Sequence, residues 1–222
     1  MRKILFLAFV ALSFCSCKDN IDNKLVGSWA SKHFITEYLV ASEIAVDNVS
    51  GTLCLEVSGE EYSVFNGEDK AMELTNLYND NAFKGGVYPG LHPALAYPID
   101  KITICANKDF DAEHPVGEPL DDIARLGFNS FYPFIANGYE YFPTSEEWWY
   151  PDRLPYSIPF ADINAEVTKL IEAYFTTWQI SPSYVAKIEF ASQPEKAGEY
   201  TFTIEMTTNG ETFETTFTHT FE

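Results

Sequence analysis

The sequence is poor in basic residues. Among its 222 residues, 14 are Lys or Arg, against 33 Asp and Glu, so the formal net charge is −19. A chain with this charge repels nucleic-acid phosphates and the headgroups of anionic lipids. The composition therefore excludes a nucleic-acid partner. The surplus of acid also favours a soluble, monomeric state for an exported protein.

The sequence also lacks the short motifs that carry common chemistries. It has no Gly-x-Ser-x-Gly, no His-Glu-x-x-His, no phosphate-binding glycine loop and no dinucleotide fingerprint. Its four histidines are scattered, and His92 and His114 each precede a proline, which is typical of turns. We therefore predict no catalytic residues, no cofactor and no metal site.

No apolar run reaches the ~20 residues that a membrane-spanning helix needs. The longest, residues 4–14, follows Arg2 and Lys3 and has the length of the hydrophobic region of a secretory signal peptide. It ends in Phe14-Cys15-Ser16-Cys17, where the small Ser16 directly precedes Cys17. This pattern resembles the lipobox of bacterial lipoproteins, with Phe14 where that family usually has Leu. The alternative is a plain, cleaved signal peptide.

The lipobox resemblance implies a signal peptide at 1–16, lipidation of Cys17 and a short polar tether over 17–24. Acyl chains that bury methylenes at ~0.8 kcal/mol each can hold a protein on a membrane without a spanning helix. Removing residues 1–16 would leave 12 basic and 33 acidic residues, a net charge of −21. The expected location is the outer membrane, facing the periplasm or the cell surface.

Cysteine is scarce, and after lipidation of Cys17 only Cys54 and Cys105 would remain. Each lies in a strand-like run and alternates away from its apolar neighbours. An exported protein can form disulfides, but two lone cysteines have no framework spacing. We predict two separate thiols.

Period-two alternation predicts most of the regular structure, in a single β-rich domain over 25–222. The strands are expected at 52–57, 61–65, 101–106, 184–190, 199–206 and 212–220, and 31–46 is read as strand rather than helix. Ser58-Gly59-Glu60 is expected to turn the first hairpin, and Asn209-Gly210 the last.

One amphipathic helix is expected at 162–178. Its apolar residues recur at spacings of three and four, Asp162 can cap its first turn, and Ser181-Pro182 ends it. Many strands and a single good helix indicate an antiparallel β sandwich with a long aromatic-rich insertion at 127–182. A lipocalin-like barrel is the alternative, because Gly27-Ser28-Trp29 resembles the Gly-x-Trp start of that family.

Residues 107–126 form the most acidic stretch of the chain. Asp109, Asp111 and Glu113 alternate as in a calcium loop, but Pro115 and Val116 stand where such a loop needs glycine. A zinc site would need a second His or a Cys pair. We predict a corner instead, in which Asp109 and Asp111 close Asx turns and a short helix begins near Pro119.

The same stretch carries a second resemblance. Ile102-Thr103-Ile104, Asp109-Phe110-Asp111, His114-Pro115-x-Gly117 and Leu120-x-Asp122 resemble a block in an uncharacterised domain family of Bacteroidetes envelope lipoproteins. That family also has a Phe-rich C-terminal hairpin with Asn-Gly or Asp-Gly. The resemblance covers about 30 residues and the last hairpin. It implies a cell-envelope protein and supplies no activity.

Residues 128–160 form the most aromatic part of the chain, and five prolines predict irregular structure through most of it. Its 12 aromatic residues are Phe128, Phe131, Tyr132, Phe134, Tyr139, Tyr141, Phe142, Trp148, Trp149, Tyr150, Tyr156 and Phe160. They form either a satellite core or, around 146–153, a sugar-binding platform.

The platform reading gives the candidate ligand-binding residues. They are Trp148, Trp149, Tyr150, Glu146, Glu147 and Asp152. We expect a non-catalytic binding or assembly module, anchored to the membrane by lipid, with a neutral glycan or an envelope protein as partner. The alternatives are a glycan-active enzyme, for which two carboxylates would have to face each other across a cleft, and a lipocalin-like binder of small ligands.

Overall fold

The computed structural model describes residues 29–87, 92–140, 154–173 and 184–222. In chain order the elements are β1 (Trp29–Ala30), β2 (Glu37–Val49), β3 (Thr52–Ser63), α1 (Asp69–Leu77), β4 (Gly86–Val87), β5 (Pro93–Leu95), β6 (Ile99–Ala106), β7 (Ala124–Ser130), α2 (Tyr132–Ala136), β8 (Leu154–Pro159), the 3-10 turn η1 (Phe160–Asp162), β9 (Tyr184–Phe190), β10 (Gly198–Thr208) and β11 (Glu211–Phe221).

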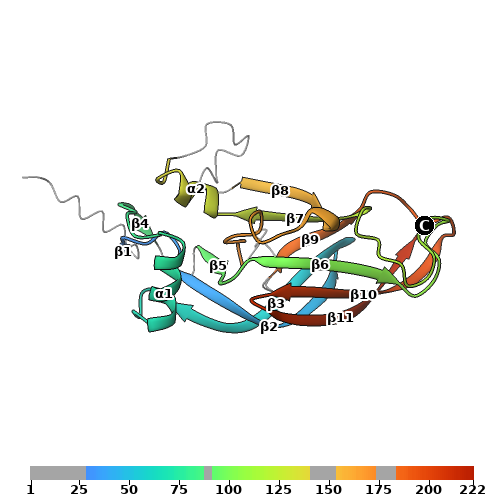
Figure 1. The fold of residues 1–222 in the computed structure, drawn as a ribbon, viewed down its shortest axis with the longest axis horizontal. Helices are drawn as coiled ribbons and strands as arrows, with labels where there is room; N and C mark the ends of the chain where they lie inside the picture. Colours follow the sequence, from blue (N-terminus) through green and yellow to red (C-terminus); the bar gives the residue numbers. More distant parts are fainter. Residues whose placement is uncertain (1–28, 88–91, 141–153, 174–183) are drawn as a thin grey trace, which may run out of the picture.

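Two curled sheets make up most of the fold (Figure 1). The larger has the strand order β5-β2-β3-β9-β7-β8, the smaller has the order β11-β10-β6, and β1 pairs with β4 in a separate ribbon. All strand pairs are antiparallel except β2 with β5. The prediction of a mainly β fold of the antiparallel sandwich type is confirmed.

The main core lies between the inner faces of these sheets. Along β7, Leu126 and Phe128 are buried while Gly127 and Asn129 alternate outward, as the period of a strand requires. Phe202 and Ile204 of β10 meet them from the smaller sheet and belong to the same apolar cluster. The alternation of β10 was predicted from the sequence, whereas β7 is not among the predicted strands.

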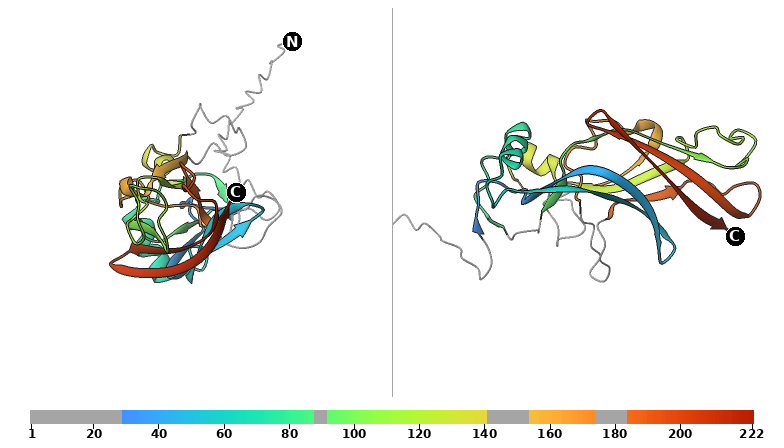
Figure 2. Two further views of the ribbon diagram at one scale, coloured as in Figure 1. Left: turned by 90° about the vertical axis from the view of Figure 1, so that its right-hand side faces the viewer. Right: turned by 90° about the horizontal axis from the view of Figure 1, so that it is seen from below.

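A second core lies at the end of the molecule that carries α1, α2 and β1 (Figure 2). Its large side chains include Phe34 from the loop before β2, Tyr38 from β2, Leu74 from α1, Phe131 at the start of α2 and Phe134 within α2. Both α-helices are short, and no helix within the described ranges is long and apolar enough to cross a membrane.

Two hairpins have the tight turns that their sequences favour. Asn209 and Gly210 both have positive φ and join β10 to β11, as predicted. Ser50 and Gly51 do the same between β2 and β3. The reading of 31–46 as strand holds from Glu37 onward, and the strands predicted at 101–106 and 184–190 correspond to β6 and β9.

The predicted hairpin at residues 58–60 is wrong, because β3 runs through them without a turn. Gly59 lies opposite Ala41, where the register of β2 shifts at a bulge. A Cβ on Gly59 would come within 1.8 Å of the carbonyl oxygen of Val40. The glycine therefore permits a close approach between two strands, which is the other use of glycine within a strand.

The predicted helix at 162–178 is also wrong over its described part. Residues 160–162 form a single 3-10 turn, residues 165–170 form turns, and Leu170 has a φ of 48°, which no α-helix accepts. Leu170 packs in the second core while Ile171 packs in the main core. The side chains that were expected to share one face thus alternate between two cores. Residues 174–178 lie outside the described ranges.

Residues 170–173, which we call the strap, run between β5 and β7. The amide of Leu95 donates to the carbonyl of Ile171 at 2.8 Å, and the amide of Phe131 donates to that of Leu170 at 3.0 Å. Isolated bridges join the strap to Ala94 and to Ser130. Because β5 pairs with β2 and β7 with β9, the strap closes a continuous ring of hydrogen-bonded segments.

The segment expected as an insertion, 127–182, contributes β7 and β8 to the larger sheet. Pro155 and Pro159 lie in β8, which is an edge strand and can do without their missing N–H groups. The expected lack of regular structure is therefore wrong for 128–136 and 154–160. Residues 141–153 lie outside the described ranges.

The first prediction concerns the strap. Leu170 is fully buried, so Leu170→Ala should reduce the free energy of unfolding by ~2–5 kcal/mol through lost apolar burial and a residual cavity. Urea denaturation followed by circular dichroism measures this loss. The matched control is Leu77→Ala on α1, where the side chain is 59% exposed and the change should stay within ~0.5 kcal/mol. Equal effects of the two substitutions would contradict the packing of the strap.

Candidate functional site

The predicted ligand-binding cluster lies outside the described residues. Trp148, Trp149, Tyr150, Glu146, Glu147 and Asp152 all fall within 141–153, and Cys17 falls within 1–28. The platform and the lipidation site therefore stay predictions.

The described aromatic residues of the same region are core residues. Phe128 and Phe160 pack in the main core, and Phe131 and Phe134 pack in the second core. Tyr156 is half-buried and stacks on Phe128 with ring centroids 5.2 Å apart. The interpretation of these aromatics as core residues is therefore confirmed, but only Phe131 and Phe134 lie in a separate, second core.

The acid-rich stretch is a corner that covers the free edge of β6. The carboxylate of Asp121 accepts hydrogen bonds from the Thr103 hydroxyl at 2.8 Å and the Ile104 amide at 2.9 Å. The Leu120 amide donates to the Ile104 carbonyl, and Asp109 accepts from the Val116 amide. The predicted corner is confirmed, although 121–123 form a turn where a short helix was expected.

His114 holds this corner together from inside. Its Nδ1 lies 2.7 Å from Asp111 and its Nε2 lies 3.0 Å from Asp122, so both ring nitrogens face carboxylates. Burial by itself lowers the pKa of His114, but the hydrogen bonds and charges of Asp111 and Asp122 outweigh it, and the pKa is raised. Burial likewise raises the pKa of Asp111, yet its bonds from His114 and the Glu113 amide lower it overall. His114 thus forms charge-assisted hydrogen bonds with Asp111 and Asp122, and we call these three side chains the clamp around His114.

Among the acids that the structure describes, Asp80, which follows α1, is the most deeply buried. It accepts hydrogen bonds from the amides of Phe34 and Ile35 at 2.8–2.9 Å and from the Tyr139 hydroxyl at 2.9 Å. Burial raises the pKa of Asp80, and these hydrogen bonds only partly oppose that effect. Burial and the charge of Asp80 raise the pKa of Tyr139 to about 12. Asp80 thus joins the loop before β2 to the segment after α2.

The two described cysteines are free thiols, as predicted. Cys54 is buried and Cys105 is half-buried. Burial raises the pKa of each thiol, and Asp47 adds to the effect at Cys54 as Asp121 does at Cys105. Both thiols therefore stay protonated and poorly nucleophilic at neutral pH.

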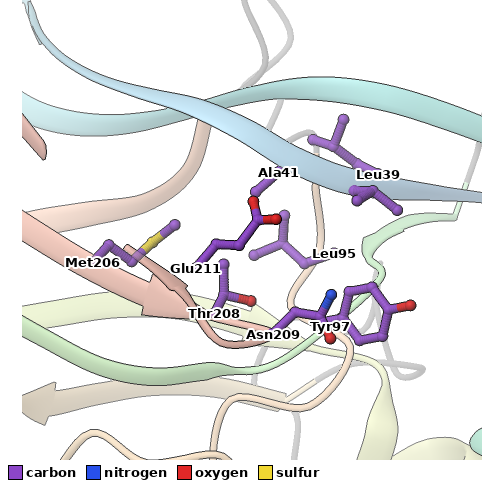
Figure 3. Close-up of a pocket in the computed structure, with 9 residues that line it drawn as sticks. Leu39, Ala41, Leu95, Tyr97, Met206, Thr208, Asn209 and Glu211 are labelled. Atoms are coloured by element: carbon purple, nitrogen blue, oxygen red, sulfur yellow. The ribbon is translucent and has the colours of Figure 1, made fainter. Parts of the chain in front are cut away.

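A pocket of about 50 Å³ opens at the seam between the two sheets, beside the β10–β11 turn (Figure 3). Its residues come from β2, from the segment around β5 and from the last hairpin. They are Leu39, Val40, Ala41, Leu95, Tyr97, Met206, Thr208, Asn209 and Glu211. A water molecule needs ~10–15 Å³ of such space, so the pocket has room for a few waters or a small ligand group.

The floor of the pocket is apolar and its rim is polar. Leu39, Leu95 and Met206 are buried, whereas Asn209 and Glu211 are exposed. In Figure 3 the Glu211 side chain extends across the pocket toward Ala41. An apolar surface with a few convergent polar groups is the usual composition of a small-ligand site.

Sequence reasoning missed this pocket. Its residues are far apart along the chain, and each reads as an ordinary strand or turn residue. The only signal was the Asn-Gly hairpin, which predicts that Thr208 and Glu211 face each other across the turn. Nothing local shows that the turn comes to lie beside β2 and β5.

The second prediction concerns Asp80. Asp80→Ala would leave the buried amides of Phe34 and Ile35 without an acceptor, at ~1–3 kcal/mol for each. The free energy of unfolding should therefore fall by ~3–5 kcal/mol in urea denaturation. The exposed Asp100 serves as control, and Asp100→Ala should change it by less than ~0.5 kcal/mol. If Asp80→Ala lowers the free energy of unfolding by less than ~1 kcal/mol, the fold does not depend on the hydrogen bonds of Asp80.

The third prediction concerns pH. Because the pKa of His114 is raised in the fold, its stabilising effect is complete below the ordinary pKa near 6.5 and disappears as pH rises through the raised value. The stability advantage of the wild type over His114→Gln should therefore shrink between pH 6 and pH 9 in thermal denaturation. Asp111, whose pKa is lowered, loses its contribution only in acid, as pH falls below about 4.

His219→Gln is the control for the pH series. Burial lowers the pKa of His219, so its contribution is complete at high pH and declines as pH falls through 6.5. The two variants should therefore show slopes of opposite sign. Parallel slopes would contradict the clamp around His114.

The sequence matches no family model and no curated protein, and the fold matches no solved structure.

Proposed function

We propose that this protein is a lipid-anchored binding or assembly module of the bacterial cell envelope, without catalytic activity. The anchor would be Cys17, on the pattern Phe14-Cys15-Ser16-Cys17 after an apolar run. The likeness of residues 102–122 to the Bacteroidetes lipoprotein domain supports the same location. The outer membrane is the proposed site.

The arrangement of the fold fits such an anchor. The described chain begins at β1, at the end that carries α1, and the C-terminus lies at the opposite end (Figure 2). The segment between Cys17 and Trp29 spans at most roughly 40 Å. The α1 end would therefore lie near the membrane and the corner at 107–122 would point away from it.

The pocket at the seam is the observation that carries the binding role. Its apolar floor and polar rim suit a small ligand or a side chain of a partner. Two described acids, the buried Asp80 and the half-buried Asp121, accept hydrogen bonds from backbone amides and hydroxyls. Such engagement favours binding over acid–base chemistry.

Other partners remain proposals of the same kind. A neutral glycan would use the rings and acids of 146–152, and a second envelope protein would use the surface away from the membrane. The small-ligand role expected of a lipocalin-like protein also fits the seam pocket. A glycan-active enzyme would need Glu146 or Glu147 to face Asp152, and it is the weaker alternative.

The fourth prediction tests the anchor. Cys17→Ala should shift the protein from the detergent phase to the aqueous phase in detergent partitioning of whole-cell extracts, because the acyl chains supply the membrane affinity. The precursor should also stay unprocessed on denaturing gels. Cys15→Ala is the matched control and should leave both properties unchanged. If Cys15→Ala abolishes anchoring and Cys17→Ala does not, the assignment of the lipidated cysteine is wrong.

A further inference from the structure

The rim of the seam pocket offers hydrogen-bond acceptors. The Thr208 hydroxyl donates a hydrogen bond to the Pro98 carbonyl at 2.8 Å, so its oxygen is left as an acceptor. The carboxylate of Glu211 is a hydrogen-bond acceptor, and it has no hydrogen bond or ion pair with any of the described residues. A ligand that satisfies both groups must therefore donate hydrogen bonds to them.

The charges around the pocket favour a cation. Glu211 is the only carboxylate among the pocket residues, which include no Lys, Arg or His, and Glu60 and Glu61 lie opposite Val40 and Leu39 in the neighbouring strand. Among the described residues, Lys70 lies 5.4 Å from the centre of the Tyr97 ring and is paired with Glu73 at 3.2 Å. Lys101 lies opposite Thr207, which alternates away from the buried pocket residues Met206 and Thr208. The chain as a whole carries a net charge of −19. An anionic ligand would meet repulsion at short and long range.

The floor of the pocket selects an aliphatic group. Leu39, Leu95 and Met206 are each at most 4% exposed, and they present apolar atoms below the acceptors. A flexible methionine side chain adapts well to an unbranched chain. A ligand therefore needs a short apolar part next to its cationic head.

We propose that the seam pocket binds a short, unbranched alkylammonium group, with its methylenes on Leu39, Leu95 and Met206 and its ammonium at Glu211 and Thr208. A volume of about 50 Å³ limits the group to a few carbons. The same chemistry belongs to a free small amine and to a lysine side chain of a partner protein. This inference rests on the proposed binding role and names the ligand class for it.

Methionine methyl resonances give a direct test. The sequence has three methionines, Met1, Met72 and Met206, so protein labelled with ¹³C-methyl methionine has one probe in the pocket. Met72 lies on α1 and reports on general effects of the ligand. The full-length protein in detergent is titrated with n-butylammonium, n-butanol and butyrate at equal ionic strength.

The Met206 methyl should shift saturably with n-butylammonium and not with butyrate, while Met72 stays in place. Glu211→Gln should weaken n-butylammonium binding about tenfold, as expected for loss of a charge-assisted contact. Glu214→Gln is the matched control, because Glu214 lies on the same strand and outside the pocket. It should bind as the wild type does.

The outcomes separate the inference from the role that it rests on. If n-butanol binds as tightly as n-butylammonium, or if Glu211→Gln binds as well as the wild type, the pocket binds ligands but the preference for ammonium is overturned. If none of the three compounds shifts Met206, the pocket is not a ligand site and the binding role loses its support as well.

A further arm identifies the source of the group. Blocked lysine (Nα-acetyl-lysine methylamide) is titrated beside n-butylammonium. Tighter binding of the blocked lysine supports the inference with a partner protein as the source, and tighter binding of n-butylammonium supports it with a free amine as the source. Failure of both to shift Met206 overturns it.

Discussion

The hydrogen bonds of the strap hold the larger sheet together at the end where the described chain begins. β5 has only three residues and pairs with β2 on one side, so it would be a frayed edge without the strap on the other. The strap fixes Leu95 by taking its amide, and Leu95 is part of the pocket floor. Leu170 has a left-handed conformation, which is costly for leucine. Its burial in the second core offsets that cost. The position of Leu95 in the pocket floor therefore depends on a hydrogen bond to Ile171, which does not line the pocket.

The pocket exists because the two sheets share a core without sharing a hydrogen-bonded edge. β2 and β11 lie next to each other, yet β2 pairs with β3 and β5, while β11 pairs with β10. Where the β10–β11 hairpin turns at Asn209 and Gly210, the chain leaves the seam and opens a space over Leu39. A fully paired barrel would close this space with strand-to-strand bonds. The open seam thus creates an opening with a polar rim in a β fold whose interior is tightly packed.

Local patterns in the sequence predict the elements that depend on local interactions. The last hairpin, β6 and β9 follow from alternation and from the Asn-Gly turn, and the corner at 107–122 follows from aspartates that bond to nearby amides. Gly59 and residues 162–173 were misread because their conformations are set by partners far away in the sequence. Gly59 meets Val40 across a bulge, and the strap takes its hydrogen bonds from β5 and β7 in place of those of a helix. The seam pocket was not predicted from the sequence for the same reason, because no segment of the chain contains more than a few of its residues.

The excess of acid has a structural use in the irregular parts of this fold. The backbone amides of Phe34 and Ile35, just before β2, donate to the carboxylate of Asp80 in place of a neighbouring strand. In the same way, the amide of Ile104, on the free edge of β6, donates to the carboxylate of Asp121. A carboxylate can accept several hydrogen bonds at once, so it suits amides that converge from a bend. Each such bond offsets part of the cost of burying the acid. Carboxylates held in this way are fixed in the protein and are not available to a ligand.

Glu211 differs from them in both respects, because it bonds to no described residue and reaches over an apolar floor. Its position, rather than the total charge of the chain, therefore determines what the pocket can select.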